Sequence, residues 1–271
     1  MMKTAVITGA GRGLGREFAL QLAAAGYDVA VTDVDLQAAE FVADEIRTGG
    51  GQACAHVLDV SNAEEWRHLR DTLQTVWPHL DVLVNNAGVL AACEHGSGTV
   101  DDIQWQVSVN LGGTLFGIHT MLPWLRTNPQ RARLLNVASY AAFVPIPWAA
   151  TYNATKAGVL ALSETLAVEL TGQNVSVTVA CPAFFPSNIF VHSQTSSSEI
   201  HDVMQYMVGK SHISAQVVAG ACLSAMWKGD LHVYVPRSSY WLSLWKRLLP
   251  GHFLGRVSRK AWRIRGRFAK H

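Results

Sequence analysis

The chain has 271 residues, of which 49% are hydrophobic and 15% are charged. This composition allows one large α/β domain with a sizeable core and excludes a disordered chain. The net charge of +2 is unevenly spread: residues 237–271 hold ten Lys or Arg and no acidic residue, so residues 1–236 hold twelve basic and twenty acidic residues, a balance of −8.

Short apolar or β-branched runs alternate along the chain with longer segments of helical periodicity. The expected strands are residues 4–8, 28–32, 53–59, 81–85, 133–138, 175–180 and 231–235. The expected helices are residues 13–25, 36–48, 62–76, 100–127, 150–170 and 215–227, with Asp35 and Ser61 as the N-caps of the second and third. Nearly continuous apolar strands are covered on both faces, and strand–helix alternation implies right-handed crossovers. We therefore predict a single Rossmann-type α/β domain over residues 1–236, a doubly wound parallel sheet of about seven strands with helices on both faces.

Residues 182–212 are the irregular stretch of this pattern and include the Ser-rich run SQTSSSE. They follow the sixth expected strand, on the side of a parallel sheet where ligands bind. For that reason we favour a substrate lid over a plain surface loop.

Three glycines, Gly9, Gly13 and Gly15, lie between the first expected strand and the first expected helix. Glycine lets the backbone approach a ligand closely and adopt left-handed dihedral angles. The amide groups at the start of the helix then face the ligand with a partial positive charge. A Gly-rich turn in this place predicts a pyrophosphate-binding loop.

Asp33 ends the second expected strand, 24 residues after Gly9. A carboxylate here would accept hydrogen bonds from the adenosine ribose hydroxyls and repel a 2′-phosphate, which favours NAD over NADP. Arg12 is the counter-argument, because a guanidinium in the loop could pair with that phosphate. The alternative is that Arg12 is a solvated cation of the loop with no phosphate partner.

Several motifs, in this order and at workable spacings, resemble those of the short-chain dehydrogenase/reductase family over nearly the whole body of the chain. They are TGAGRGLG at 8–15, LDV at 58–60, NNAG at 85–88, Asn110, Ser139, YNATK at 152–156 and CPAFFPS at 181–187. The resemblance implies cofactor contacts by Gly9, Arg12, Gly13, Leu14, Gly15, Asp33, Asp59, Val60, Asn86, Ala87, Gly88, Tyr152, Lys156, Pro182 and Ser187. Ala183 and Ser187 depart from the glycine and threonine that are usual in the last motif. The serine keeps the hydroxyl, and the alanine methyl adds bulk near the nicotinamide.

The same resemblance implies a catalytic set of Asn110, Ser139, Tyr152 and Lys156. Tyr152 and Lys156 share one face of a helix, because they are four residues apart. A free phenol has a pKa of about 10. We expect the nearby ammonium and an oxidised nicotinamide to lower the pKa of Tyr152 by up to about three units. Tyr152 would then exchange a proton with the substrate oxygen, which Ser139 orients, while Lys156 binds the ribose and Asn110 holds a water that links Lys156 to solvent.

These residues predict an NAD(P)-dependent oxidoreductase that moves a hydride between the cofactor and an apolar secondary alcohol or ketone. Phe143, Trp148, Phe184 and Phe185 flank the motifs and either line an apolar substrate pocket or pack in the core. The alternatives are a catalytically silent nucleotide-binding scaffold and a membrane-associated partner protein. The resemblance implies a homodimer or homotetramer built on the helices at about 100–127 and 150–171.

Further features bear on cofactors and location. Four widely spaced cysteines indicate free thiols in a reducing cytoplasm, and eleven histidines follow no ligand pattern, so we expect no metal. The nine residues up to the first glycine leave no room for the apolar region of a signal peptide, and no run of 18 apolar residues follows. We expect a soluble, cytoplasmic body.

Residues 237–271 form a basic, aromatic-rich C-terminal extension. Trp241, Leu242, Leu244, Trp245, Leu248 and Leu249 recur at helical spacing beside Lys246 and Arg247, and Pro250–Gly251 breaks the pattern. A basic amphipathic helix with tryptophans suits an anionic membrane surface. The alternatives are packing on the domain or on another subunit and, less favoured, nucleic acid, because the body is acidic and carries no groove-reading motif.

Overall fold

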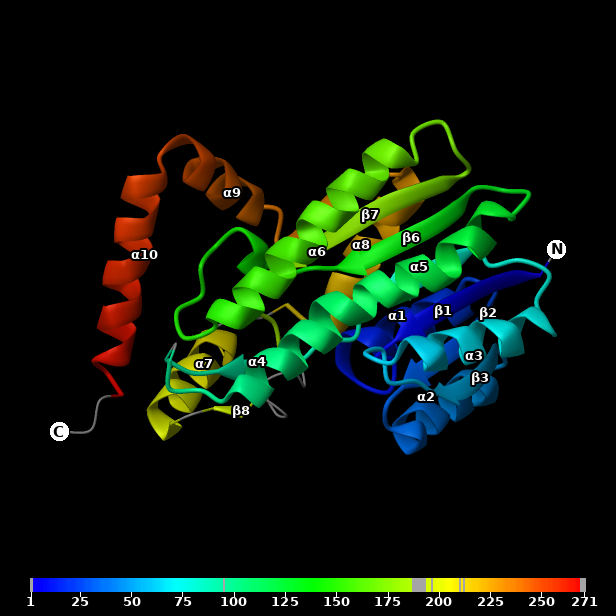
Figure 1. The fold of residues 1–271 in the computed structure, drawn as a ribbon, viewed down its shortest axis with the longest axis horizontal. Helices are drawn as coiled ribbons and strands as arrows, with labels where there is room; N and C mark the ends of the chain where they lie inside the picture. The colour runs from blue at the N-terminus through cyan, green and yellow to red at the C-terminus, as the bar shows by residue number, and fades with distance from the viewer. Residues whose placement is uncertain are drawn as a thin grey trace.

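A seven-stranded sheet forms the centre of the molecule (Figure 1). In the computed structural model, which describes residues 2–94, 96–186, 194–195, 197–209, 211 and 213–268, neighbouring strands of this sheet are parallel. Their order is β3 (Gln52–Val57), β2 (Tyr27–Asp33), β1 (Lys3–Thr8), β4 (Val82–Asn85), β6 (Ala132–Val137), β7 (Val175–Pro182) and β9 (His232–Val235). The order reverses at β1, so the predicted doubly wound sheet is confirmed, and the crevice for a ligand lies at the carboxyl ends of β1 and β4.

Helices cover both faces of the sheet. One face carries α1 (Gly13–Ala24), α2 (Leu36–Thr48) and α8 (Ala215–Lys228), and the other carries α3 (Ala63–Gln74), α5 (Gly113–Arg126) and α6 (Ala150–Glu169). Within β1, Ile7 belongs to the first core cluster and Val6 to the second, which also contains the fully buried Trp66. Successive strand residues point to opposite faces and both faces are covered, which explains the continuous apolar runs in the sequence.

Two helix starts were predicted from capping residues. The Asp35 side chain accepts a hydrogen bond from the first turn of α2, as expected. The prediction of Ser61 for α3 is wrong by one residue, because the cap is Asn62. The Ser61 hydroxyl instead donates to the Asp59 carboxylate at 2.7 Å. This local hydrogen bond competes with capping of the helix.

The helix predicted over residues 100–127 is interrupted. α4 (Val100–Val107) runs into a π-helical turn, Ser108–Gly112, before α5 continues to Arg126. A π turn widens the helix locally and is frequent at functional sites. This one carries Asn110, which is fully buried.

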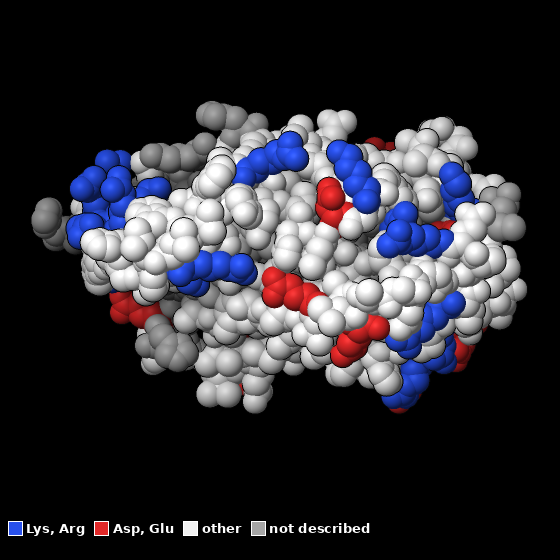
Figure 2. Space-filling model, turned by 90° about the horizontal axis from the view of Figure 1, so that it is seen from above, with Lys and Arg blue, Asp and Glu red and all other residues white. Residues whose placement is uncertain are grey.

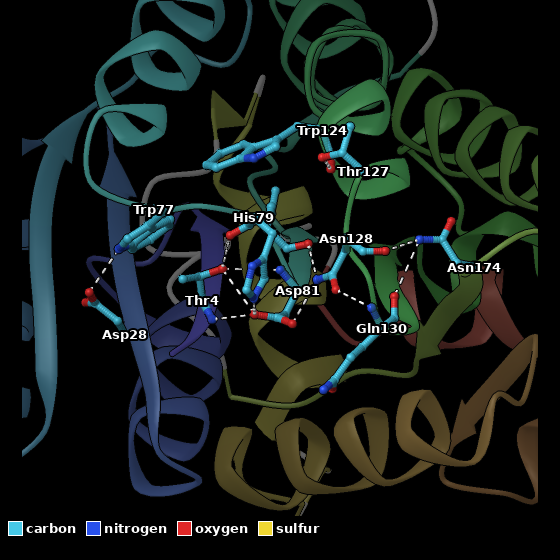
Figure 3. A network of polar contacts seen from close by, with 11 residues as sticks. Thr4, Asp28, Trp77, His79, Asp81, Trp124, Thr127, Asn128, Gln130 and Asn174 are labelled. Atoms are coloured by element: carbon cyan, nitrogen blue, oxygen red, sulfur yellow. Dashed lines mark hydrogen bonds and ion pairs between the residues drawn. The ribbon is translucent and has the colours of Figure 1, made fainter. Parts of the chain in front are cut away.

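A polar network joins the segments that enter the strands, at the amino ends of the sheet (Figure 3). Asp81, directly before β4, accepts hydrogen bonds from the Thr4 amide of β1 and from the Asn128 side chain, both at 2.8 Å. Asn174, directly before β7, donates to the Asn128 carbonyl at 2.6 Å. The network therefore fixes these strand starts at the edge of the sheet away from the carboxyl ends.

The region predicted to be irregular contains a helix. β5 (Ala91–Ala92) pairs with β8 (Gln194–Thr195), and α7 (Ser198–Gly209) follows. Residues 187–193, 196, 210 and 212 lie outside the described residues. α7 buries Ile200, Val203, Met204 and Val208. This helical spacing was present in the sequence and could have predicted α7 in spite of the serines before it.

The tail forms α9 (Ser239–Leu248) and α10 (Pro250–Arg265), and Pro250 starts the second helix at the predicted break. One face of the tail packs on the domain through Leu242, Trp245 and Phe253. Its outer surface exposes Trp241, Leu248, Leu249, Leu254 and Trp262, and Lys and Arg side chains gather at this end of the molecule (Figure 2). Among the helices that the structure describes, none is long and apolar enough to pass through a bilayer.

Candidate active site

A cavity of about 520 Å³ opens at the carboxyl ends of the strands. Its lining comes from the ends of β1, β2, β4, β6 and β7 and the segments that follow them, from the turn after β3, and from the first turn of α1, α4, the π turn, the start of α6, and α7. The predicted site residues in the lining are Gly9, Arg12, Gly13, Leu14, Asp33, Asp59, Val60, Asn86, Ala87, Gly88, Ser139, Tyr152, Lys156 and Pro182. Gly15 and Asn110 contact lining residues without lining the cavity themselves, and Ser187 lies outside the described residues.

The turn between β1 and α1 has a backbone that requires glycine. Gly9 and Gly13 have φ angles of +60° and +55°, where a Cβ would be strained. A Cβ on Gly15 would lie 2.1 Å from the carbonyl oxygen of Gly9. The cavity is thus bordered by a turn with few side-chain atoms and by the amino end of a helix, which together form the kind of surface that binds a pyrophosphate. These residues fit a dinucleotide.

The NNAG motif ties this turn to the end of β4. The Asn86 side chain donates to the carbonyl oxygens of Thr8, at 2.9 Å, and Gly9, at 3.1 Å. In return, the Thr8 hydroxyl accepts from the amides of Asn86 and Ala87, each at 3.0 Å. The ends of β1 and β4 are therefore locked together at the switch point of the sheet.

A buried polar chain continues below the cavity. Asn85 in β4 donates to the Asn136 side chain in β6 at 2.9 Å, and Asn136 donates to the Ser163 hydroxyl of α6 at 3.0 Å. All three residues are buried. Buried hydrogen bonds of this kind favour one arrangement of the elements that carry them. They hold α6 in register with the central strands.

The Asp33 side chain is oriented by hydrogen bonds within the protein itself. Its two carboxylate oxygens accept hydrogen bonds from the amides of Gly11, at 2.9 Å, and Asp35, at 3.1 Å. Arg12, which the sequence left as a phosphate partner or a solvated cation, forms a surface ion pair with Asp35 at 2.5 Å. Its charge is therefore shared with a carboxylate two residues from Asp33.

Asp59 and Val60 form the adjoining wall. The Asp59 carboxylate accepts from both the amide and the hydroxyl of Ser61, at 2.9 and 2.7 Å. The Val60 carbonyl accepts from the indole N–H of the buried Trp66 at 3.0 Å. Both residues are thus fixed by contacts within their own turn and the following helix, and the cavity-facing surface is left for a ligand.

Ser139, Tyr152 and Lys156 lie close together in the lining of the cavity. Ser139 follows β6 and accepts from the Ala141 amide at 3.1 Å, while Tyr152 and Lys156 lie one turn apart on α6. The Lys156 ammonium donates to the Val137 carbonyl at 2.9 Å and lies 5.8 Å from the centre of the Tyr152 ring. The structure thus brings together three groups that are up to 17 positions apart in the sequence.

The pKa of Tyr152 shifts in the opposite direction from our expectation. Burial raises the pKa of the Tyr152 phenol to about 12, and a hydrogen bond with Ser139 offsets only part of this rise. Burial also lowers the pKa of Lys156 to about 8. Both charged forms are disfavoured by removal from water, an effect that sequence spacing does not reveal. The protein's own groups therefore keep Tyr152 protonated at neutral pH.

Asn110 points its side chain at the loop after β4. Its Oδ1 accepts from the Val89 amide at 2.7 Å, and its Nδ2 donates to the Val89 carbonyl at 2.9 Å and to the Thr155 hydroxyl at 3.2 Å. Thr155 precedes Lys156 on α6. The side chain therefore joins the π turn, the β4 loop and α6.

The far half of the cavity is apolar. Its lining includes Leu90, Trp105, Ile146, Phe184, Phe185 and Met204. Of the four flanking aromatics, Phe184 and Phe185 line the cavity, whereas Phe143 is buried in a core cluster and Trp148 packs beside Tyr152 in another. Leu90, Trp105, Ile146 and Met204 had not been singled out from the sequence. They come from four separate segments, which only the fold brings together.

A sequence model described as short chain dehydrogenase matches residues 3–197. The chain belongs to the short-chain dehydrogenase family. This family of oxidoreductases uses nicotinamide cofactors, in agreement with the motifs and with the cavity that they line.

Individual relatives in the short-chain dehydrogenase family agree with this assignment. The chain is 32% identical over 219 residues to 3-oxoacyl-[acyl-carrier-protein] reductase of Synechocystis, covering 80% of this chain and 86% of that protein. It is 33% identical over 183 residues, 68% of its length, to the probable oxidoreductase EphD of Mycobacterium tuberculosis, and the match spans only 31% of that protein. A short-chain dehydrogenase/reductase from Burkholderia phymatum in complex with NAD superimposes with a TM-score of 0.86 and 28% identity, covering 91% of this chain and 93% of that one.

Proposed function

We propose that the chain is an NAD-dependent ketone reductase or alcohol dehydrogenase for an apolar secondary alcohol or ketone. The observation that carries the proposal is the meeting of Ser139, Tyr152 and Lys156 in a cavity that has a dinucleotide cradle on one side and an apolar wall on the other. A catalytically silent scaffold would not need these three groups together in the cavity.

The residues that would hold the cofactor follow from the cavity lining. The turn containing Gly9 and the amino end of α1 would bind the pyrophosphate, and Asp59 and Val60 would flank the adenine. Lys156 would bind the nicotinamide ribose, and Pro182 would contact the nicotinamide. When bound, the cofactor supplies or accepts the hydride.

NAD is the proposed cofactor in preference to NADP. Asp33 lines the cavity, and its carboxylate is already oriented by two backbone amides. A fixed carboxylate accepts hydrogen bonds from ribose hydroxyls and repels a phosphate in the same place. Arg12, the group that could attract that phosphate, is paired with Asp35.

Tyr152 would act as the proton donor in ketone reduction. With a pKa of about 12, the phenol carries its proton at neutral pH and can give it to the alkoxide oxygen that forms as the carbonyl carbon receives a hydride. Ser139 would donate a hydrogen bond to the same oxygen. The Lys156 ammonium would stabilise the phenolate left behind, and the polar path past Asn110 would return the proton from solvent. A protonated phenol is the form that ketone reduction requires.

The apolar half of the cavity indicates the substrate class. Leu90, Ile146, Phe184 and Met204 offer hydrocarbon and aromatic surface beside the Tyr152 hydroxyl. Such a wall favours a ketone with an aliphatic or aromatic substituent. The name of the Synechocystis relative describes the reduction of a 3-oxoacyl group, which is a ketone on an acyl chain, and this agrees with the proposal.

The test is NADH oxidation by purified protein, followed at 340 nm with 2-butanone, 2-hexanone, 2-octanone and 2-decanone. Burial of each added CH₂ is worth about 0.8 kcal/mol, so kcat/KM should rise about fourfold per carbon until the cavity is filled. Binding of NADH without turnover of any ketone or alcohol would support the silent scaffold instead. Equal kcat/KM along the series would contradict an apolar substrate wall.

Contact of the tail with an anionic membrane surface is a second candidate role for residues 237–271, taken as an extension of the catalytic domain at 1–236. The exposed Trp241, Leu248 and Trp262 beside cations favour it. Sedimentation with vesicles of phosphatidylglycerol and phosphatidylcholine, at low and high salt, should show salt-sensitive binding that Trp241→Ser weakens. Failure to sediment at low salt would leave packing on the domain as the role of these helices.

Self-association is proposed through α4, α5 and α6. This surface exposes the apolar residues Ile103, Val107, Leu115 and Val168. Apolar residues gathered on adjacent exposed helices mark an interface. Light scattering should give a mass of two or four chains, and Leu115→Glu should shift it toward one. A monomeric wild type would exclude this assembly.

A further inference from the structure

The guanidinium of Arg265, near the end of α10, contacts three segments around the apolar half of the cavity. Its Nε donates to the Glu199 carboxylate in α7 at 2.8 Å, and its Nη1 donates to the Glu94 carboxylate after β5 at 2.5 Å. Its central carbon lies 5.7 Å from the centre of the Trp148 ring. Three segments that are distant in sequence therefore share one cationic partner, which the tail supplies.

The contact with Glu199 connects Arg265 to α7, which contributes Met204 to the apolar half of the cavity. Glu199 lies in the first turn of α7, next to the buried Ile200, and Met204 one turn later lines the cavity. Ile200 and Met204 belong to the same core cluster as Tyr152. A second tail residue, Arg267, donates to the Tyr206 hydroxyl of α7 at 2.9 Å. The tail thus holds α7 at both its first and its third turn.

The contact with Trp148 leads to the catalytic helix. Trp148 has a φ angle of +63°, in the left-handed region that costs free energy for a residue with a Cβ, and it stands directly before the N-cap of α6. Its carbonyl accepts from the Cys93 amide at 2.8 Å, and Cys93 precedes Glu94. Such a conformation persists only where neighbours enforce it. Arg265 meets both sides of this turn, through the Trp148 ring and through Glu94.

We propose that Arg265 is a positioning residue that sets substrate selectivity, and that α10 acts within the same chain as a strap over α7 and the Trp148 turn. The strap fixes the spacing between Met204 on α7 and Tyr152 on α6, and so the width of the apolar half of the cavity. The expected effect of the strap on KM rests on the proposed function, but its expected effect on the local stability of α7 does not. Part of the basic tail therefore serves the active site rather than an external anion.

Hydrogen–deuterium exchange tests the strap without any substrate. Arg265→Ala should raise amide exchange in residues 198–209 about threefold or more, because loss of partly exposed ion pairs eases local opening. Exchange in β1 and β4 should not change. Arg263→Ala, an exposed cation on the same helix, is the matched control. In the wild type, 0.5 M NaCl should reproduce part of the Arg265→Ala effect by screening.

Kinetics separate positioning from general damage. With 2-octanone and NADH, Arg265→Ala should raise KM about fivefold with a smaller change in kcat and an unchanged Kd for NADH, and Arg265→Lys should recover part of the loss. Equal exchange in the Arg265→Ala and Arg263→Ala proteins would overturn the strap, whatever the activity. If the wild type reduces no ketone but the exchange pattern holds, the strap stands and the proposed function fails.

Discussion

Lys156 donates from its side-chain nitrogen to the backbone oxygen of Val137, 2.9 Å away at the end of β6. The bond joins α6 to the strand that leads, two residues later, to Ser139. Lys156 is only 3% exposed, and its ammonium is costly to bury without partners. The Val137 carbonyl satisfies one of its three donors. In the proposed function, the other two donors would serve the ribose and the proton path. The position of Lys156 is therefore set by the strand, independently of Tyr152.

Replacement of Tyr152 by Phe should abolish turnover and leave cofactor binding intact. The change removes the proton donor and little else, so we expect kcat to fall about 10²- to 10⁴-fold. NADH fluorescence titration supplies the control, since its Kd should stay within about twofold. A variant that reduces 2-octanone as fast as the wild type would exclude Tyr152 as the proton donor.

Replacement of Lys156 by Met should stabilise the protein at pH 7, and the gain should shrink as the pH rises. The folded pKa of Lys156, about 8, lies below its ordinary 10.5, so between these values the unfolded chain binds more protons and the free energy of unfolding of the wild type rises with pH. We expect the gap between variant and wild type to narrow by about 2 kcal/mol from pH 7 to pH 9.5.

Urea unfolding at pH 7, 8, 9 and 9.5 measures this gap. The range stops below pH 10, because the raised pKa of Tyr152 makes stability fall again once the unfolded phenol begins to ionise. A gap that stays constant over this range would show that Lys156 is not buried as an ammonium in the folded protein.

Replacement of Asp33 by Asn should change the cofactor preference. The amide keeps one oxygen acceptor for the Gly11 or Asp35 amide but loses the negative charge. We expect the variant to bind NADH about tenfold more weakly than the wild type does, and to bind NADPH more tightly. The difference between the binding free energies of the two cofactors should therefore shift by about 1.4 kcal/mol or more. Fluorescence titrations with both cofactors measure it, and Arg12→Ala controls for the neighbouring charge. Unchanged relative affinities would remove Asp33 as the selector.

Replacement of Gly15 by Ala should prevent cofactor binding. The new Cβ would lie 2.1 Å from the Gly9 carbonyl, so the turn must open, at a cost of about 1–3 kcal/mol in stability. Gly220→Ala in α8 is the matched control, because its Cβ meets only the end of the Gln21 side chain at 3.4 Å. The control should gain about 0.5–1 kcal/mol from helix propensity. Normal NADH binding by the Gly15 variant would contradict the tight turn.

The sequence predicted the features whose signals are local. The strands are apolar runs, the cofactor turn is a spacing of glycines, and Tyr152 and Lys156 are one helical turn apart, so neighbouring residues were sufficient for each. The interruption at Asn110 was missed, because the residues around it have an uninterrupted helical pattern. α7 was missed because the serines before it suggested a loop, although Ile200 and Met204 carried the helical period.

The remaining differences come from long-range packing. The pKa of Tyr152 moves upward because residues of several separate segments, among them Leu90 and Met204, bury it. The spacing to Lys156 suggested only the attraction of nearby charge. The partners of Arg265 lie 66 and 171 positions earlier in the chain. No pattern in the tail distinguishes this cation from Arg263, which is exposed on the same helix. Only the folded chain separates them.

The two halves of the cavity are held by different kinds of contact. Below the cofactor half, Asn85, Asn136 and Ser163 form a buried chain of hydrogen bonds, where a lost partner is expensive. The apolar half, which we propose as the substrate side, depends instead on Arg265, whose side chain is 23% exposed, and on its two partly exposed carboxylate partners. Surface substitutions are usually mild in their effect on stability. Changes in the tail and in α7 can therefore alter the substrate of a descendant of this chain and leave its redox chemistry unchanged. A mutant library for altered selectivity should target those two segments.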